Sequence, residues 1–246
     1  MKISKEIPFE RLVSRQVRLW DYTHEEIKRR QSEQPVSCIT ISREMGSQGS
    51  ELAHSLANRL NWHLFDKELI ELIAENAHVR NSMVESFDEK TQNEMQIWVT
   101  TLLSHHILGA GKFQHCLFTT ILSMAEKGEA VILGRGGNFI LPPYKALRLK
   151  VIMPLQNRLD KVAKQKDLTR KAAARLIADV DKARVAFIRR FFHHDAMDPL
   201  YYDLVLNMGT LDLETAEEIV VHTLETKSKL ILKTNKDIKA PETRSD

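Results

Sequence analysis

A glycine-containing segment follows the most strand-like stretch of the chain and is the first candidate for chemistry. Residues 43–50 include Gly46 and Gly49, between a β-branched stretch at 36–42 and a helix-patterned stretch at 51–60. The first N–H groups of a helix have no partners within it, and the helix dipole adds positive charge at that end. This order predicts an anion site suited to phosphate. An ordinary glycine turn between a strand and a helix fits the same pattern.

Two further candidates stand at the predicted carboxyl ends of strands. Asp66 follows the short apolar stretch 63–65, and Arg135 lies in a Gly-Arg-Gly turn after the apolar run 130–133. Open α/β sheets bind ligands at this edge, and a guanidinium suits bidentate recognition of phosphate. Asp66 could equally cap the helix that follows it, and Arg135 could be a solvated turn residue.

The positive charge of the chain is concentrated in one segment, 158–190. It carries eleven Lys and Arg against four Asp, a net charge of +7 in a chain whose total is +3. Its apolar spacing predicts two helices. A basic helical pair suits a lid over polyphosphate, whereas a solvated face with pairing between successive helical turns is the structural alternative.

Several of these segments, in the order in which they occur, resemble the cytidylate kinase-like family of P-loop proteins, relatives of the nucleoside-monophosphate kinases. The resemblance extends over about residues 36–225. It is carried by Ile41-Ser42-Arg43-Glu44-x-Gly46-Ser47-x-Gly49 with its helix, by 62–70, by the Gly-Arg-Gly turn, by Asp181-x-x-Arg184 within 177–192, and by 202–207.

The resemblance implies an α/β, three-layer P-loop kinase fold. We expect an open parallel five-stranded sheet with helices on both faces, a helical insertion and a basic helical lid. A final helix is expected over 213–224. The expected organisation is a helical extension at 1–35, a kinase-like domain at 36–230 with an acceptor-site insertion at 79–129 and a lid at 155–192, and a frayed polar tail at 231–246. The extension is either packed on the domain or a contact for a partner, including a second copy.

The resemblance also implies phosphoryl transfer from ATP, with Mg²⁺, to a small acceptor, most simply a nucleoside monophosphate such as CMP. The acceptor would be held by Asp66 and Arg135. Arg184, oriented by Asp181 on the same helical face, would close over the transferring group with either Arg189 or Arg190, since adjacent residues point about 100° apart. The donor phosphates would be held by Arg43, Gly46, Ser47, Gln48, Gly49 and Ser50, with the Ser50 hydroxyl on the Mg²⁺ side.

The loop and the Gly-Arg-Gly turn depart from the cytidylate kinases. The position of the P-loop lysine falls on Gly49 and that of the following Ser/Thr on Glu51, so Arg43 is the candidate for the missing cation. Gly136 stands where cytidylate kinases carry aspartate, which puts cytidine specificity in question. A non-catalytic nucleotide-binding or regulatory module therefore remains an alternative, and a nucleic-acid-binding module using 158–190 a weaker one.

Composition excludes several other classes. At 246 residues, with 43% hydrophobic and 28% charged residues, the chain can bury one substantial core. Cys38 and Cys116 offer neither a disulfide framework nor zinc-ligand spacing, and no histidine group fits a zinc pattern. The net charge is too small for a general nucleic-acid binder. With no long uncharged apolar run and no N-terminal leader, we expect a cytoplasmic protein without a membrane partner.

Overall fold

The computed structural model describes residues 36–105 and 111–239. One sheet of five parallel strands, in the order β2-β3-β1-β4-β5, forms its centre. The strands are β1 (Cys38–Arg43), β2 (His63–Phe65), β3 (Ala130–Leu133), β4 (Ala146–Ile152) and β5 (Leu204–Asn207). The predicted open, parallel, five-stranded sheet is confirmed.

The inner strands are nearly continuous apolar runs because helices cover both faces of the sheet. Alternate residues of a strand point to opposite faces, so Cys38 belongs to one core and Ile39 to the other. In the pairing of β1 with β4, Ser42 lies opposite Lys150. These two polar side chains therefore share one face of the sheet near its carboxyl edge.

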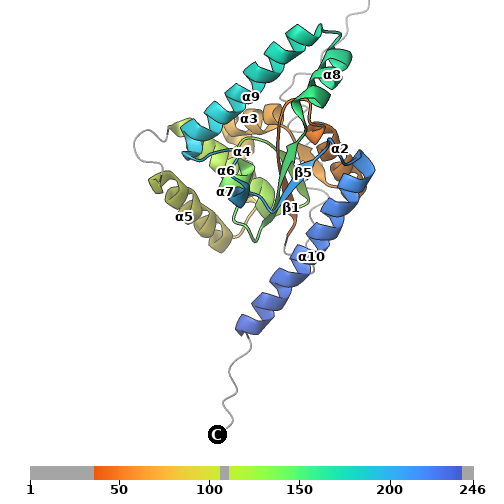
Figure 1. Cartoon of the computed structure of the whole chain (residues 1–246). Coiled ribbons are helices and arrows are strands. Elements are labelled where there is room, and N and C mark those ends of the chain that lie inside the picture. The colour runs from red at the N-terminus through yellow and green to blue at the C-terminus, as the bar shows by residue number, and fades with distance from the viewer. Residues whose placement is uncertain (1–35, 106–110, 240–246) are drawn as a thin grey trace, which may run out of the picture.

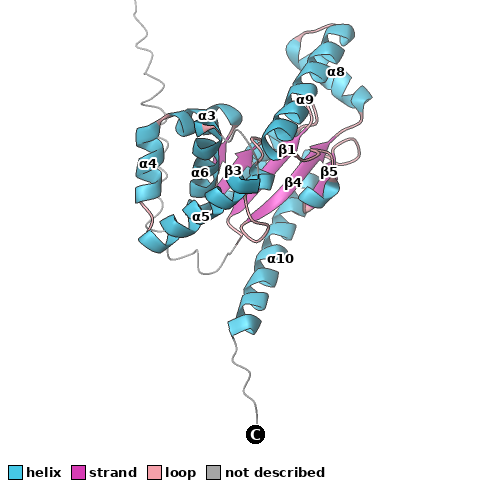
Figure 2. Ribbon diagram, turned by 90° about the vertical axis from the view of Figure 1, so that its left-hand side faces the viewer, coloured by secondary structure: helices cyan, strands magenta, loops and turns pink. Residues whose placement is uncertain are grey.

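The helices divide between the two faces, as Figure 2 shows. On one face α2 (Gly49–Leu60) and α10 (Leu213–Lys239) pack together over the sheet. The other face is covered by α3 (Lys67–Glu75), α4 (Ala77–Glu85), α5 (Glu89–His105), α6 (Lys112–Lys127) and the short α7 (Gly137–Ile140). The helices predicted within 79–129 are thus present wherever the structure describes that range.

A pair of helices projects above the carboxyl ends of the strands (Figure 1). These are α8 (Leu155–Lys166) and α9 (Arg170–Phe192), as predicted for 155–192, and we call them the lid. A small apolar cluster that includes Val162 and Ile177 holds the pair together. The far end of α9 joins the main core through Phe192, and a 3-10 turn (Pro199–Tyr201) then leads into β5.

The last helix is longer than the sequence predicted. Instead of ending at 224, α10 continues to Lys239, so the frayed tail expected from 231 is wrong for 231–239. Lys227 anchors the extra turns, since its Nζ donates to the carbonyl of Ala146 at 2.9 Å and to Asp203 at 2.6 Å. Ser228 is buried and Ile231 packs on the core beside α2. The predicted extension at 1–35, with its oligomer contact, lies outside the described residues.

Candidate functional site

A cavity of about 500 Å³ opens at the carboxyl edge of the sheet beneath α9. Its walls come from the ends of β1 and β4, the turn after β3, the start of α3 and the inner face of α9. Five basic side chains and three acidic ones line it, so its wall is net positive. These charged residues are Arg43, Glu44, Lys67, Glu68, Arg135, Lys150, Asp181 and Arg184.

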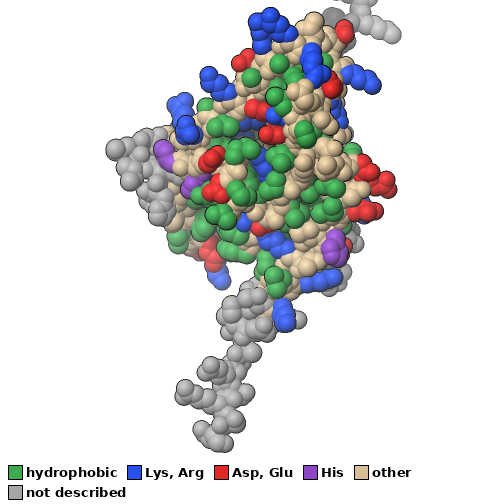
Figure 3. Space-filling view, in the orientation of Figure 1, with side chains coloured by type: hydrophobic (Ala, Val, Ile, Leu, Met, Phe, Trp, Pro, Cys, Tyr) green, Lys and Arg blue, Asp and Glu red, His purple; other side chains and the backbone are tan. Residues whose placement is uncertain are grey.

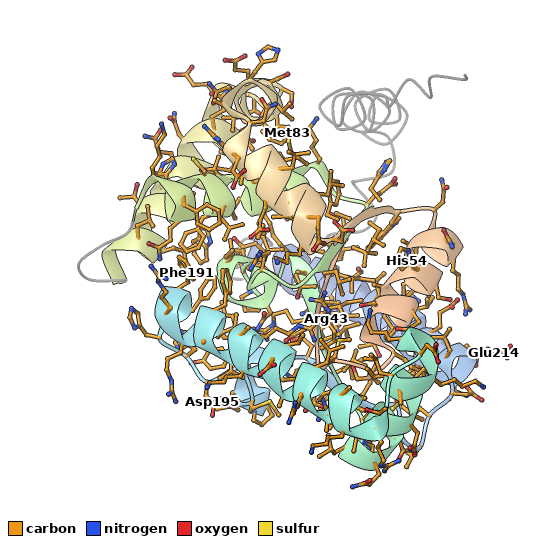
Figure 4. The ribbon with its side chains drawn as sticks, turned by 90° about the horizontal axis from the view of Figure 1, so that it is seen from above. Arg43, His54, Met83, Phe191, Asp195 and Glu214 are labelled. Carbon is orange, nitrogen blue, oxygen red and sulfur yellow. The ribbon has the colours of Figure 1, made fainter. Side chains whose placement is uncertain are left out.

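Arg43 passes between two glycines on its way into the cavity. A Cβ on Gly49 would lie 2.5 Å from Arg43 Cβ, and one on Gly134 would lie 2.5 Å from Arg43 Nη1. Both glycines are therefore needed for the path of this side chain. Figure 4 shows Arg43 near the centre of the molecule, under the lid.

The guanidinium of Arg43 makes no direct ion pair within the described part of the chain. Its Nε is buried without a hydrogen-bond acceptor. Burial, and then the neighbouring Arg184, lower the pKa of Arg43 to about 10, while the carboxylates of Glu68 and Asp66 oppose that shift, so the group stays charged at neutral pH. A buried cation without a direct anionic partner is costly unless a ligand supplies one. Arg43 therefore marks a place where an anion fits.

Arg135 sits in the turn after β3 with φ +51°, a backbone conformation that non-glycine residues seldom adopt. Its guanidinium pairs with Glu71 and lies 4.6 Å from the centre of the Phe187 ring. Burial lowers the pKa of Arg135, and the carboxylates of Glu71 and Glu68 oppose that shift. The predicted phosphate-binding arginine thus lines the cavity, with a carboxylate behind it.

Asp181 connects the lid to the loop after β1. Its Oδ1 accepts the N–H of Met45 at 2.8 Å, and its Oδ2 accepts from Arg158 Nη1 at 2.6 Å. The same carboxylate lies 3.6 Å from Arg184 Nη1, which donates to the carbonyl of Arg43 at 3.1 Å. Asp181 and Arg184 therefore share one helical face, as the spacing predicted, and Arg184 reaches the loop.

The rest of the predicted loop does not line the cavity. Ser47 is fully buried, and its Oγ donates to the carbonyls of Glu44 at 3.0 Å and Val151 at 3.2 Å. Gly46 faces the lid, where an added Cβ would meet Val162 at 2.6 Å. Of this segment, residues 42–45 line the cavity, whereas Gln48, Gly49 and Ser50 do not.

Three other predicted residues also lie away from the cavity. Asp66 caps α3, its Oδ1 accepting the N–H of Leu69 at 2.9 Å, while the two residues after it line the wall. Arg189 and Arg190 are both exposed, and Arg190 stacks on Phe191. The expectation that one of these arginines faces inward is wrong for this conformation, because both lie on the outer side of α9. Figure 3 likewise shows Lys and Arg side chains over the outer surface of the lid.

Sequence reasoning missed Lys150 and Glu44, although both line the cavity. Lys150 is 6% exposed on the inner strand β4. The signal was available: a single lysine among apolar residues of a strand buried on both faces is exceptional. Glu44 accepts the N–H of Met153 at 3.2 Å and lies 3.6 Å from Arg158 Nε, so its role is to hold the loop and the lid together.

Comparisons with known proteins agree with this geometry. The family model described as the cytidylate kinase-like family matches residues 38–210, more than half of the chain. The chain belongs to the cytidylate kinase-like family. Membership of this family supports a kinase-like activity that depends on a nucleotide.

Two solved structures and one curated protein are similar to this family member. The crystal structure of an uncharacterized protein from Eubacterium ventriosum has a TM-score of 0.58 at 21% identity, covering 77% of this chain and 98% of that one, which supports the fold. Shikimate kinase from Bacteroides thetaiotaomicron has a TM-score of only 0.43 at 14% identity, covering 76% of this chain and 98% of that one.

The curated protein is uronate isomerase from Corynebacterium glutamicum, 32% identical over 108 residues. The match covers 44% of this chain but only 21% of that protein, so the chain spans about a fifth of the length of this relative.

The aspartate of true cytidylate kinases does not fit at Gly136 of this family member. The residue has φ +72°, and an added Cβ would lie 2.3 Å from Cε2 of Phe192. Phe192 is 1% exposed and stacks on Phe118 and Phe139, so its ring cannot easily move aside. A side chain at Gly136 would therefore meet the ring of Phe192.

The described residues suit phosphates better than a protein-held Mg²⁺. Five cationic side chains face the cavity, but the described ranges hold no group of three His, Cys, Asp or Glu side chains that could bind a metal ion. Ser50, the predicted Mg²⁺ ligand, lies outside the cavity wall, and the carboxylates of Glu44 and Asp181 are paired with Arg158.

Among the described helices, none combines the length and apolar character needed to cross a bilayer.

Proposed function

We propose that the protein transfers the γ-phosphoryl group of ATP to a small acceptor that itself carries a phosphate, most simply a nucleoside monophosphate. The observation that carries this proposal is the buried guanidinium of Arg43, which faces the cavity without a direct ion-pair partner and with its Nε unsatisfied. In phosphoryl transfer the protein contributes positioning and charge stabilisation rather than covalent chemistry. A net positive cavity at the carboxyl edge of the sheet supplies both.

In the reaction, an oxygen of the acceptor's phosphate attacks the γ-phosphorus of ATP. A new P–O bond forms while the bond from the γ-phosphorus to the β,γ-bridging oxygen breaks, and that electron pair leaves with ADP. No general base is required, because a phosphate monoester has a second pKa of about 6 and is largely ionised at neutral pH.

The side chains of the cavity take separate roles in this proposal. Arg43 holds donor phosphate in place of the absent loop lysine, and Arg135 holds the phosphate of the acceptor. Arg184 neutralises the charge of the transferring group from the lid side, and Asp181 fixes its orientation. Asp66 acts through the helix that it caps, since that helix presents Lys67 and Glu68 to the cavity.

A turnover assay with a panel of acceptors tests the proposal. The protein is incubated with ATP and Mg²⁺ and each nucleoside monophosphate in turn, and both products are separated by chromatography. We expect a nucleoside diphosphate and ADP in equal amounts for at least one acceptor. Arg43→Met, folded by circular dichroism, is expected to lose about 100-fold or more in turnover. ADP formation without any phosphorylated acceptor contradicts the proposal.

A non-catalytic nucleotide-binding module is the second candidate. It is favoured by the carboxylate of Asp181, which occupies the Met45 N–H at the loop, and by the absence of a loop lysine. In that case ATP would bind with little dependence on Mg²⁺ and no acceptor would be phosphorylated. Calorimetric titration with ATP, with and without Mg²⁺, separates the two candidates when it is read beside the turnover assay.

A further inference from the structure

Lys150 is a buried lysine on an inner strand, and it forms no direct ion pair among the described residues, although its Nζ lies 5.6 Å from the centre of the Tyr202 ring. Its strand, β4, lies between β1 and β5, and the neighbouring Leu149 and Val151 face the core beside α2 and α10. Lys150 therefore points to the other face, where it lines the cavity. A buried lysine is normally paired with a carboxylate.

The ammonium of Lys150 has only neutral acceptors among the described residues. Its Nζ donates to the carbonyl of Ala196 at 3.2 Å and to Ser42 Oγ at 3.5 Å. The nearby carboxylates of Glu44 and Asp181 form their ion pairs with Arg158 instead. Burial lowers the pKa of Lys150, the carboxylates of Glu44, Asp181 and Asp195 oppose that shift, and Arg184 adds to it.

A purely structural role does not account for the residue. The carbonyl of Ala196 already accepts a hydrogen bond from the Tyr202 hydroxyl at 2.8 Å, and that hydroxyl also lies 3.5 Å from Ser42 Oγ. The turn after α9 is thus held without Lys150. A neutral side chain of similar length would satisfy the same space without the cost of burying a charge.

The position of Lys150 relates it to the phosphate site. Arg184 interacts electrostatically with both Arg43 and Lys150, so it stands near each of them. The three cations line one cavity. The loop itself offers no lysine.

We propose that Lys150 is a catalytic residue of this site, whose ammonium contacts an oxygen of the bound phosphate chain and, together with Arg43, supplies the positive charge that the lysine-free loop lacks. This inference rests on the proposed function. In the free protein the ammonium donates hydrogen bonds to Ala196 and Ser42, and in the complex it donates to a phosphate oxygen.

The test compares two variants of the full chain with the wild type by calorimetric titration with tripolyphosphate and with ATP and Mg²⁺. Lys150→Met removes the charge. Tyr202→Phe removes the other hydrogen bond to the same carbonyl and leaves the charge in place. We expect Lys150→Met to weaken binding of both ligands about 10- to 100-fold, as the loss of one charged hydrogen bond does. Tyr202→Phe should stay within about twofold of the wild type.

Thermal unfolding supplies a readout independent of any ligand. A lysine retained for phosphate binding costs stability, so Lys150→Met should melt at the same temperature as the wild type or higher. A lower melting temperature with unchanged affinity would make Lys150 structural and overturn the inference. If Lys150→Met fails to fold, Lys150→Gln, which keeps a donor toward Ala196 and loses only the charge, takes its place with the same expected loss.

The outcomes separate this inference from the proposed function. Wild-type protein that binds neither tripolyphosphate nor ATP contradicts both. If the wild type binds and Lys150→Met binds with the same affinity, the role of Lys150 is contradicted and the proposed function is not. An equal loss of affinity in Lys150→Met and Tyr202→Phe would also contradict the role of Lys150. Partial recovery of affinity in Lys150→Arg, which restores the charge with different geometry, supports it.

Discussion

The guanidinium of Arg43 reaches the centre of the molecule because a glycine stands on either side of it. Gly49, from the loop, and Gly134, from the turn after β3, each leave the space that a Cβ would take. The sequence placed Arg43 and both glycine segments at the ligand edge. The resemblance assigned Gly49 to the donor phosphates, whereas the structure shows Gly49 and Gly134 making room for an arginine side chain.

Deprotonation of Arg43 gives a prediction in pH. Its pKa is lowered to about 10, so the positive charge is present at neutral pH and is lost as the pH rises through about 10. The affinity for tripolyphosphate should therefore fall as the pH is raised from neutral to above about 10. Calorimetry measures the affinity, and circular dichroism verifies the fold at each pH. Arg43→Met should bind weakly at every pH and show a smaller fall in affinity over the same range. Parallel pH profiles would contradict the prediction.

Replacing Arg184 tests whether the lid contributes to turnover through this side chain. Arg184→Ala removes the guanidinium that reaches the loop carbonyl of Arg43, and it should reduce turnover about 100-fold. Because Arg184 is only partly buried, the free energy of unfolding should change by about 1 kcal/mol or less. Arg175→Ala, on the exposed side of the same helix, is the matched control and should behave as the wild type. Equal losses of rate and stability in Arg184→Ala would make this arginine structural.

At the scale of elements, the lid is held to the loop by a small set of polar contacts. Asp181 receives the Met45 N–H and Arg158, and Arg158 also approaches Glu44. The helical spacing predicted Asp181 and Arg184 on one face. It could not predict the partners of Arg158, because residues far apart in the sequence meet only when the lid packs.

A double-mutant cycle measures this connection. Asp181→Ala leaves Arg158, which is 8% exposed, without its closest counter-ion, and should cost about 2 kcal/mol of unfolding free energy. Adding Arg158→Met should recover part of that loss, because no unpaired charge then remains. Urea denaturation gives the values. Strictly additive losses would show that the two side chains are not coupled.

The end of α10 and the exposure of Arg189 and Arg190 both differ from what the sequence predicted. Lys227, Ser228 and Ile231 belong to a polar-looking stretch, and only the bonds of Lys227 to Ala146 and Asp203 and the packing of Ile231 on the core reveal why the helix continues. Arg189 and Arg190 follow Ile188, which is buried, and lie outside because the inward positions go to apolar residues.

At the scale of the whole molecule, the sheet separates two apolar cores and leaves its charged cavity at one edge. The cores lie between α2 and α10 on one face and among α3 to α7 on the other. This arrangement was predictable, because apolar strands alternating with helical patterns favour a parallel sheet. The role of Lys150 was not predicted, although its strand gave a signal, because Lys150 belongs to no motif and shares its strand with a second charged residue, Arg148.

Ligand binding should stabilise the molecule as a unit. A ligand that binds only the folded protein adds about 2.7 kcal/mol at one hundred times its dissociation constant. For a domain of this size that corresponds to roughly 5–10 °C in melting temperature. We expect such a rise with ATP and a much smaller one in Arg43→Met, measured by differential scanning calorimetry. A rise of the same size in both proteins would place the nucleotide elsewhere.

The most direct test of the central claim is a crystal structure of the protein with a dinucleoside pentaphosphate, which carries the phosphates of donor and acceptor in one chain. The cavity at the carboxyl edge of the sheet should contain that chain, with nitrogen atoms of Arg43, Arg135 and Arg184 about 2.7–2.9 Å from phosphate oxygens. A phosphate chain bound outside this cavity, or guanidinium groups that remain turned away from it, would contradict the account.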